Sequence, residues 1–335
     1  MSVAVLIVAY NSKAHLARQI AALEVQTFRD FRAVLIDNAS RPEERPDPAT
    51  LSSWVTLIQA QDNLGFAGGN NTAAEAAPEA EFLALLNPDA FPEPGWLQAL
   101  VDAAARHPHA AAFGSTQLLD ADPSRLDGAG DALHATGIPW RGGLGMSASE
   151  LPPEGETFAA CGAAMLIRAA DFRAVGGFDE RFFCYVEDVD LGYRLRLAGR
   201  ATMQIPDAVV RHIGGGVSAR GSAFADFHGA RNRVWMQVKS APARLFWPLL
   251  PFTVAVTLAN LLVNTLKGRT AGWRGLFAAL GDLGPAWAAR QALRKGRKAS
   301  VTDIAAALAW NPLRLLDRKP VIRRRKAWPA NGTRP

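Results

Sequence analysis

The stretch Glu81-Phe-Leu-Ala-Leu-Leu-Asn-Pro-Asp89 constrains the fold of this chain more than any other. Phe82 to Leu86 is a short, nearly continuous apolar run, typical of an inner β-strand that is covered on both faces. Pro88 ends the strand because it has no N–H for a sheet ladder and disfavours helix at Asn87. Asp89 is left at the carboxyl end of the strand, where open α/β sheets bind ligands. A carboxylate there can hold a divalent cation on a diphosphate; a plain Asn-Pro-Asp turn is the alternative.

Two other predicted strands also end on polar residues. Val3 to Val8 predicts a first strand, which Tyr10-Asn11 follow, and Phe31 to Ile36 predicts a second, which Asp37-Asn38 follow. Because parallel strands share one edge, we expect these turns to converge with Asp89 on a single crevice. An Asp directly after the second strand commonly hydrogen-bonds the ribose or base of a nucleotide. An Asx turn is the alternative for that position.

A glycine-rich segment runs from Asp62 to Asn71. Its glycines, among them Gly65 and Gly68, are expected to let the backbone approach a ligand closely before a helix starts near Asn70. The segment lacks the Lys-Ser/Thr ending of a Walker loop, and it follows a later strand than the usual dinucleotide fingerprint does.

Three carboxylates, in the order Glu-Asp-Val-Asp, open a predicted helix further along the chain. The amino end of a helix favours negative charge and keeps carboxylates ionised. We expect Asp190 to form an i,i+4 ion pair with Arg194. Asp188 has Gly192 four residues on, which predicts open space beside its carboxylate and makes it the candidate base, with Glu187 positioning an acceptor hydroxyl. A helix that is merely well capped is the alternative.

His212 precedes a run of three glycines, residues 214 to 216. A histidine beside a backbone that can wrap an anion predicts a metal ligand or a diphosphate contact. A hydrogen-bonded structural histidine is the alternative. Residues 120–157 are rich in turn-forming residues, and we expect them to be loops that shape a second-substrate pocket. Cys161 to Arg168 predicts a strand.

The charge is divided unevenly along the chain. Residues 1–240 carry 20 Lys+Arg and 28 Asp+Glu, whereas residues 241–335 carry 17 and 3. An acidic body with a basic tail indicates a tail that meets an anionic membrane or nucleic acid. Because the basic residues alternate with apolar anchors, we expect no nucleic-acid partner. The two cysteines have no Cys-x-x-Cys spacing, which indicates neither a disulfide framework nor a zinc site and fits a reducing cytoplasm.

The basic tail begins with an apolar segment. Leu245 to Leu266 is 22 residues without a charge, long enough to cross a bilayer. A single crossing would place the basic residues that follow it outside the cell, against the positive-inside tendency. Pro248 and Pro251 fit a bent, shallow insertion, and residues 273–287 predict an interfacial amphipathic helix. We therefore expect monotopic or peripheral attachment to the inner leaflet of a bacterial membrane, at its cytoplasmic face. A core helix or a dimer helix is the alternative.

Taken together, these motifs resemble the family-two glycosyltransferases over residues 3 to about 235. The matching segments are Val8-Ala-Tyr-Asn11, Ile36-Asp37-Asn38, Asn63-x-Gly65-x-x-Gly68-x-Asn70, Leu86-Asn-Pro-Asp89, Gly176-Gly-Phe-Asp-Glu180, Glu187-Asp188-Val-Asp190 and His212-x-Gly-Gly-Gly216. The Asn-Pro-Asp and Glu-Asp-Val-Asp forms are most similar to the branch with bacterial rhamnosyltransferases that act on cell-wall and surface polysaccharides.

The resemblance implies a GT-A fold, an α/β architecture with a Rossmann-like, mostly parallel central sheet flanked by helices. It implies inverting transfer of a sugar from a nucleotide-diphosphate donor, best guessed as L-rhamnose from dTDP-rhamnose. The implied acceptor is a hydroxyl of a glycan or lipid-linked glycan, and the implied cofactor is a divalent metal, Mg²⁺ or Mn²⁺. A nucleotidyltransferase and a non-catalytic nucleotide-sugar-binding membrane adaptor are the alternatives.

The resemblance also assigns roles to individual residues. Asp188 matches the general base, with Glu187 beside it, and Asp89 and His212 match positions that reach the metal or diphosphate. The implied nucleotide-binding residues are Tyr10, Asn11, Asp37, Asn38, Asn63, Gly65, Gly68, Asn70 and Asn87. Asn87 replaces the first Asp of the family's Asp-x-Asp motif, which weakens two-carboxylate metal binding. We expect a GT-A domain over residues 1–240, with a nucleotide-sugar half (1–118) and an acceptor half (119–240), and a helical membrane-associating tail over 241–335.

Overall fold

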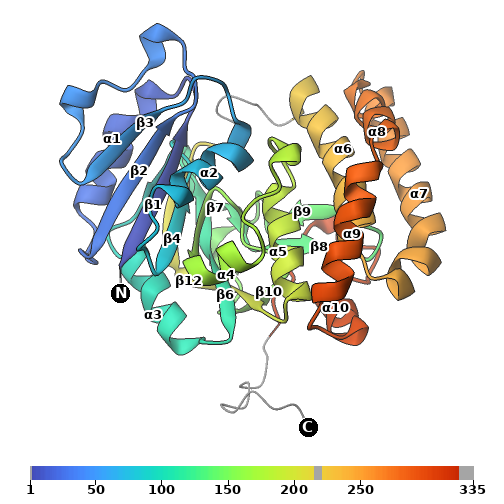
Figure 1. Ribbon diagram of the computed structural model, residues 1–335. Coiled ribbons are helices and arrows are strands. Elements are labelled where there is room, and N and C mark those ends of the chain that lie inside the picture. The colour runs from blue at the N-terminus through green and yellow to red at the C-terminus, as the bar shows by residue number, and fades with distance from the viewer. Residues whose placement is uncertain (1, 215–220, 324–335) are drawn as a thin grey trace.

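The computed structural model describes residues 2–214 and 221–323 and shows a sheet sandwiched between helices, with a bundle of further helices beside it (Figure 1). Two residues of the predicted glycine run, Gly215 and Gly216, and the basic residues 324–326 lie outside the described residues. Within the described residues, ten strands form the main sheet, whose central order is β10-β12-β6-β11-β4-β1-β2-β3. The strands are β1 (Val3–Ala9), β2 (Phe31–Asp37), β3 (Val55–Gln59), β4 (Phe82–Leu86), β5 (Ala90–Pro92), β6 (Ala110–Leu119), β7 (Asp122–Ala129), β10 (Gly155–Thr157), β11 (Ala164–Arg168) and β12 (Ala201–His212).

The helices fall into two groups. Those that accompany the sheet are α1 (Lys13–Glu24), α2 (Gly65–Glu75), α3 (Trp96–Arg106), α4 (Ala169–Ala174) and α5 (Glu187–Leu197). Those of the carboxyl-terminal region are α6 (Ala223–Ser240), α7 (Ala243–Leu266), α8 (Ala271–Gly281), α9 (Gly284–Gly296), α10 (Val301–Ala307) and α11 (Arg314–Asp317). An α/β sheet flanked by helices is what the sequence predicts, but the sheet is mixed rather than mostly parallel, because antiparallel pairs join β10, β11, β5 and β7 to their neighbours.

Strand β4 is an inner strand covered on both faces, as predicted. Phe82, Ala84 and Leu86 face a cluster completed by α1 and α3, while Leu83 and Leu85 face a cluster completed by α2, α4 and α5. This alternation is what a two-residue side-chain period requires when helices cover both sides of a sheet. β4 pairs in parallel with β1, which pairs in parallel with β2, so the carboxyl ends of all three strands lie along one edge.

The other half of the sheet is mixed. β11 runs antiparallel between β4 and β6, and β12 runs parallel to β6. The short strand β5 then pairs antiparallel with the end of β12, with Ala90 opposite His212. That register places the residue before Ala90, which is Asp89, beside His212.

Four sequence expectations differ from the structure. Residues 120–157 are not only loops: they contain β7, β8 (Asp131–Leu133), β9 (Pro139–Arg141) and β10. Helix α2 starts at Gly65 rather than near Asn70. The strand predicted from Cys161 starts at Ala164. Residues 273–287 are two helices, because Gly281 and Gly284-Pro285 interrupt the apolar pattern between α8 and α9.

The carboxyl-terminal helices pack onto α5 and the segments beside it through a shared core. Phe158, Tyr193 and Phe182 contact a hydrophobic cluster that includes Trp235 of α6 and Ile304 of α10. Isolated bridges join His134 to Ala309 and Glu156 to Arg323. The helices therefore form one continuous body with the sheet.

Candidate active site

Asp89 and His212 meet in a buried contact. His212 Nε2 lies 3.2 Å from Asp89 Oδ1, and His212 Nδ1 is hydrogen-bonded to Asp127 Oδ2 at 2.8 Å. Nε2 is nevertheless a buried atom without a hydrogen bond of acceptable geometry. Burial works against ionisation of Asp89, but the adjacent His212 outweighs it and lowers the pKa of this carboxyl.

This arrangement fits a divalent cation. A metal-ligating histidine commonly donates its other ring N–H to a carboxylate, which fixes the ring, and Asp127 is placed to accept that bond. Nε2 and the Asp89 carboxylate then face one point, where an imidazole nitrogen and an oxygen can both serve as ligands. Asn87 stands at the end of β4, where its N–H donates to Ala163 O at 2.8 Å.

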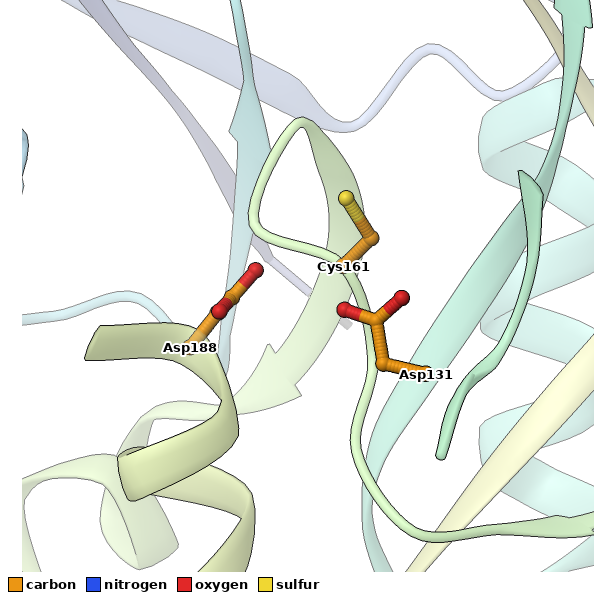
Figure 2. Close-up of side chains that lie close together, drawn as sticks. All are labelled: Asp131, Cys161 and Asp188. Atoms are coloured by element: carbon orange, nitrogen blue, oxygen red, sulfur yellow. The ribbon is translucent and has the colours of Figure 1, made fainter. Parts of the chain in front are cut away.

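Asp188 lies in the first turn of α5, in a second polar cluster. Its Oδ2 accepts from Gly162 N at 3.0 Å and its Oδ1 from Val189 N at 2.8 Å. Ligand-type atoms of Asp131, Cys161 and Asp188 all lie within 4.8 Å of one another. Figure 2 shows the Asp131 and Asp188 carboxylates on opposite sides of this space, with one Asp131 oxygen directed toward Asp188. Burial raises the pKa of Asp188 and, more strongly, that of Asp131, because it penalises the charged forms.

Arg141 connects the two clusters. One guanidinium nitrogen, Nη1, pairs with Asp127 Oδ2, and the other, Nη2, donates to Cys161 Sγ at 3.1 Å. Contacts therefore run without a break from Asp89 through His212, Asp127 and Arg141 to the cluster that holds Asp188.

Glu187 is also buried, with 5% of its surface exposed, and its Oε2 has no hydrogen-bond partner. Burial and then the neighbouring Asp188 raise the pKa of Glu187 well above its usual value. Asp190 has a different role: it pairs with Arg194 at 2.8 Å, as predicted, and with Lys239 of α6 at 2.8 Å. The open space predicted beside Asp188 is absent, because Gly192 is in contact with Ala159, which a Cβ at position 192 would meet at 2.5 Å.

The candidate nucleotide-binding residues form a third cluster, at the carboxyl ends of β1 and β2. Asn11 N donates to Ser40 Oγ at 3.0 Å, and Asp37 Oδ1 accepts from Ser40 N at 3.2 Å. Asn38 Nδ2 donates to Asn63 Oδ1 at 3.0 Å and to Gly65 O at 3.1 Å. Tyr10 is half-buried at the end of β1. These side chains lie on the same edge of the sheet as Asp89.

In the glycine-rich segment, Asn70 and the glycines were expected to contact a ligand, but their contacts in the structure are with the protein. Asn70 is buried and donates to Phe66 O at 2.9 Å within α2. A Cβ at Gly65, whose φ is +69°, would meet Phe183 O at 2.4 Å, and one at Gly68 would meet Leu64 Cβ at 3.0 Å. The close approaches of these glycines are thus to the protein itself.

Sequence reasoning missed Asp127, Asp131 and Arg141, which lie in the region read as loops. The signal was Asp127-Gly-Ala-Gly-Asp131, where two acids flank small residues. Small residues such as glycine let other side chains approach the backbone closely, so acids beside them can be buried in contact with those side chains.

The mixed sheet, with polar clusters at the carboxyl ends of β1, β2 and β4, is of the GT-A class. The model of the glycosyl transferase family 2 matches residues 4–174, and the chain belongs to this family. It is therefore a glycosyltransferase.

Rhamnosyltransferases are among its relatives. The chain is 33% identical over 234 residues to the N-acetylglucosaminyl-diphospho-decaprenol L-rhamnosyltransferase of Mycobacterium tuberculosis, a match that covers 62% of this chain and 75% of the relative. It is 40% identical over 68 residues to the rhamnosyltransferase WbbL of Escherichia coli, covering 19% of this chain and 26% of that protein.

Two solved structures share the fold. GalNAc-T7 with UDP, GalNAc and Mn²⁺ aligns with a TM-score of 0.61 and 17% identity, over 76% of this chain and 51% of that one. The mannosyltransferase PcManGT from Pyrobaculum calidifontis, in complex with GDP-Man and Mn²⁺, aligns with a TM-score of 0.50 and 18% identity, over 91% and 86%.

Proposed function

We propose that this enzyme transfers L-rhamnose from dTDP-rhamnose, with inversion, to a hydroxyl of a lipid-linked cell-wall or surface-polysaccharide precursor. The observation that carries the proposal is the unbroken line of contacts from Asp89 and His212 to the cluster around Asp188. The relatives support the sugar and the acceptor class, since the mycobacterial relative is named for rhamnose transfer and for a diphospho-decaprenol compound. Membership of the family argues against a nucleotidyltransferase and against a non-catalytic adaptor.

In the proposed reaction, Asp188 removes the proton of the acceptor hydroxyl while that oxygen attacks the anomeric carbon. The bond from this carbon to the diphosphate oxygen breaks on the opposite face, and the electron pair leaves with the diphosphate. Burial raises the pKa of Asp188, which makes it a stronger base than a solvated carboxylate, and general-base help is worth about 10²–10⁴-fold. Glu187, with its unpartnered Oε2, would position the acceptor hydroxyl.

The leaving diphosphate belongs at Asp89 and His212 in this proposal. A divalent cation, Mg²⁺ or Mn²⁺, bound by these two side chains would offset the negative charge that develops on the diphosphate. Asn11, Asp37, Asn38 and Asn63 would hold the nucleotide, with Tyr10, Asn87 and the Gly65–Asn70 segment around it.

We also propose that the region after residue 240 attaches the enzyme to the cytoplasmic face of the inner membrane. Among the described residues, one helix, α7, is long and apolar enough to cross a membrane by length and composition. Only Thr257 and Leu261 of its residues are buried, so a core helix accounts poorly for it. The catalytic domain would then comprise residues 1–240, with the donor half at 1–118 and the acceptor half at 119–240.

The function is tested by incubating the purified enzyme with a panel of nucleotide sugars and a polyprenyl-diphosphate-linked glycan acceptor. We expect transfer from dTDP-rhamnose with Mg²⁺ or Mn²⁺, and loss of transfer with chelator. Asp188→Asn should lower kcat by at least about 10²-fold while nucleotide diphosphate still binds. Near-normal turnover in this variant would refute the role of Asp188, and transfer of a different sugar would refute the donor.

A further inference from the structure

We propose that Arg141 is a positioning residue of the transfer reaction, one that holds the Asp188 carboxylate in its ionised, reactive state. The proposal rests on the proposed role of Asp188 as base. It concerns a residue that does not touch the acceptor but acts through its neighbours.

The β8–β9 hairpin positions Arg141 beside the cluster that holds Asp188. In the β8–β9 hairpin Asp131 is paired directly with Arg141, so the two side chains leave the hairpin at one level. The arm of Arg141 then lies against Gly128, where an added Cβ would come within 2.5 Å of Arg141 Cγ. Its guanidinium is held at two points, by Asp127 Oδ2 and by Cys161 Sγ. The fork geometry of guanidinium makes such a two-point hold directional.

The ionisable side chains around Arg141 are three carboxyl groups and the Cys161 thiol. Burial alone would lower the pKa of Arg141, but Cys161, Asp127, Asp131 and Asp188 together raise it above its usual value, so the residue stays charged. A metal ion among Asp131, Cys161 and Asp188 would be the other source of positive charge. It is disfavoured, because burial raises the pKa of the Cys161 thiol to about 12 and Mg²⁺ or Mn²⁺ prefers oxygen ligands. Arg141 therefore supplies the balancing charge.

The groups that face Asp188 come from several elements. Asp131 lies across the cluster on β8, Cys161 lies beside it before β11, and Arg141 approaches from β9. Glu187 and Asp190 share its helix, and Arg194 and Lys239 already pair with Asp190. Among these neighbours, Arg141 is the cation whose charge lowers the pKa of Asp188 against burial.

A base works when deprotonated, so transfer falls as the pH drops below the pKa of Asp188. Removing Arg141 raises that pKa, so the acid limb of the kcat profile moves to higher pH and activity returns as the pH rises. An opposite charge at close range is typically worth about one to three pH units.

The test is the pH dependence of kcat for the wild-type enzyme, Arg141→Met and Arg141→Lys. Arg141→Met should move the acid limb upward by about one unit or more and reduce turnover at neutral pH by roughly 10–100-fold. Arg141→Lys, which keeps the charge but not the two-point hold, should move it less. The matched control is Arg200→Met, which removes an arginine from a half-buried ion pair with Asp171 and should leave the profile unchanged. A lower kcat with an unmoved profile in Arg141→Met would overturn the proposal.

A readout without turnover keeps this test separate from that of the proposed function. Carboxyl resonances of ¹³C-aspartate-labelled protein, assigned with Asp188→Asn, report the titration of Asp188 directly. Should the wild-type enzyme transfer no sugar, an upward shift of this titration in Arg141→Met would still support the role of Arg141, and an unchanged titration would overturn it. If Arg141→Met does not fold, the titration of Asp188 is measured in Arg141→Lys instead. A small upward shift of the Asp188 pKa would then support the role of Arg141, and an unchanged pKa would overturn it.

Discussion

Asp188 is subject to two opposing influences at the scale of the single residue. Burial penalises its charge and raises its pKa, while backbone N–H groups of Gly162 and Val189 bond the ionised form and lower it. Gly162 is suited to this position because a Cβ there would meet Phe66 Cζ at 2.9 Å. The net upward shift leaves a carboxylate that is more basic than a solvated one, which is the property that a general base needs.

His212 is the residue for which the structure makes the clearest prediction about metal binding. Replacing Asp127 by Asn keeps the size of the side chain but removes the charge that orients His212 through Nδ1. Loss of such a partner of a metal ligand typically costs 10–100-fold in metal affinity. We expect Asp127→Asn to weaken Mn²⁺ binding by about that factor and His212→Ala to weaken it more, as measured by calorimetry in the presence of nucleotide diphosphate.

The control for this measurement is His107→Ala, because His107 pairs with Glu154 away from the site. Its Mn²⁺ affinity should equal that of the wild type. Unchanged Mn²⁺ affinity in His212→Ala would remove His212 from the metal site.

At the scale of the element, the segment before α5 is strained and is held by α6. Phe183, Tyr185 and Val186 have φ of 63°, 71° and 72°, a region that side chains other than glycine seldom adopt. The amide of Asn232 lies within hydrogen-bonding distance of three carbonyls of this segment: Phe182 O at 2.8 Å, Cys184 O at 2.9 Å and Tyr185 O at 2.8 Å. Phe183 O also accepts from Ala67 N of α2 at 3.2 Å. The segment thus joins α2, α5 and α6.

The sequence predicted β4 and the start of α5 correctly, because each is determined by residues that are neighbours in the sequence. The run Phe82–Leu86 stops at Pro88, and the three acids fit the amino end of a helix, so each signal is complete within a few residues. The hairpins of residues 122–141 were missed, because their small and charged residues depend on partners such as Cys161 and His212 that are distant in sequence. The positive φ values at Phe183 and Val186 were equally out of reach, since ordinary residues adopt them only where surrounding contacts, such as those of Asn232 and Ala67 with this segment, impose them.

Asn232→Ala tests whether the clamp on this segment supports catalysis. The substitution removes the side-chain donor of Cys184 O and Tyr185 O, while Phe182 O still accepts from Arg231 Nη2, and we expect a cost of about 1–3 kcal/mol in the free energy of unfolding. We expect that loss in urea denaturation and, below the unfolding transition, a fall in kcat of about 10-fold or more, because Asp188 follows the segment directly. Asn264→Ala, which removes an amide bonded to Asn260 on α7, is the control and should retain kcat. A destabilised Asn232→Ala with full kcat would show that the base does not need the clamp.

At the scale of the whole molecule, exposed apolar side chains concentrate after residue 240. Phe252, Leu262 and Leu266 of α7 are 62%, 56% and 88% exposed, and Phe277 of α8 is 64% exposed. Exposed basic residues, including Arg244 and Lys267, stand at the two ends of α7. Contiguous apolar surface with a basic border is the composition of a surface that binds anionic lipid.

The membrane proposal therefore predicts that a triple substitution, Phe252→Ser, Leu262→Ser and Leu266→Ser, releases the enzyme from vesicles. The three side chains are mostly exposed, so the fold should tolerate the change. Each apolar side chain contributes roughly 1.5–3 kcal/mol when fully buried, and partial insertion of three of them corresponds to at least about a 10-fold loss of affinity. Flotation with vesicles that contain anionic phospholipid measures this loss. Val25→Ser, at an exposed apolar residue after α1, is the control and should float like the wild type. Vesicle binding that survives the triple substitution would show that the attachment lies elsewhere in the protein. A wild-type enzyme that does not bind vesicles but dimerises through α7 would identify this helix as a subunit interface.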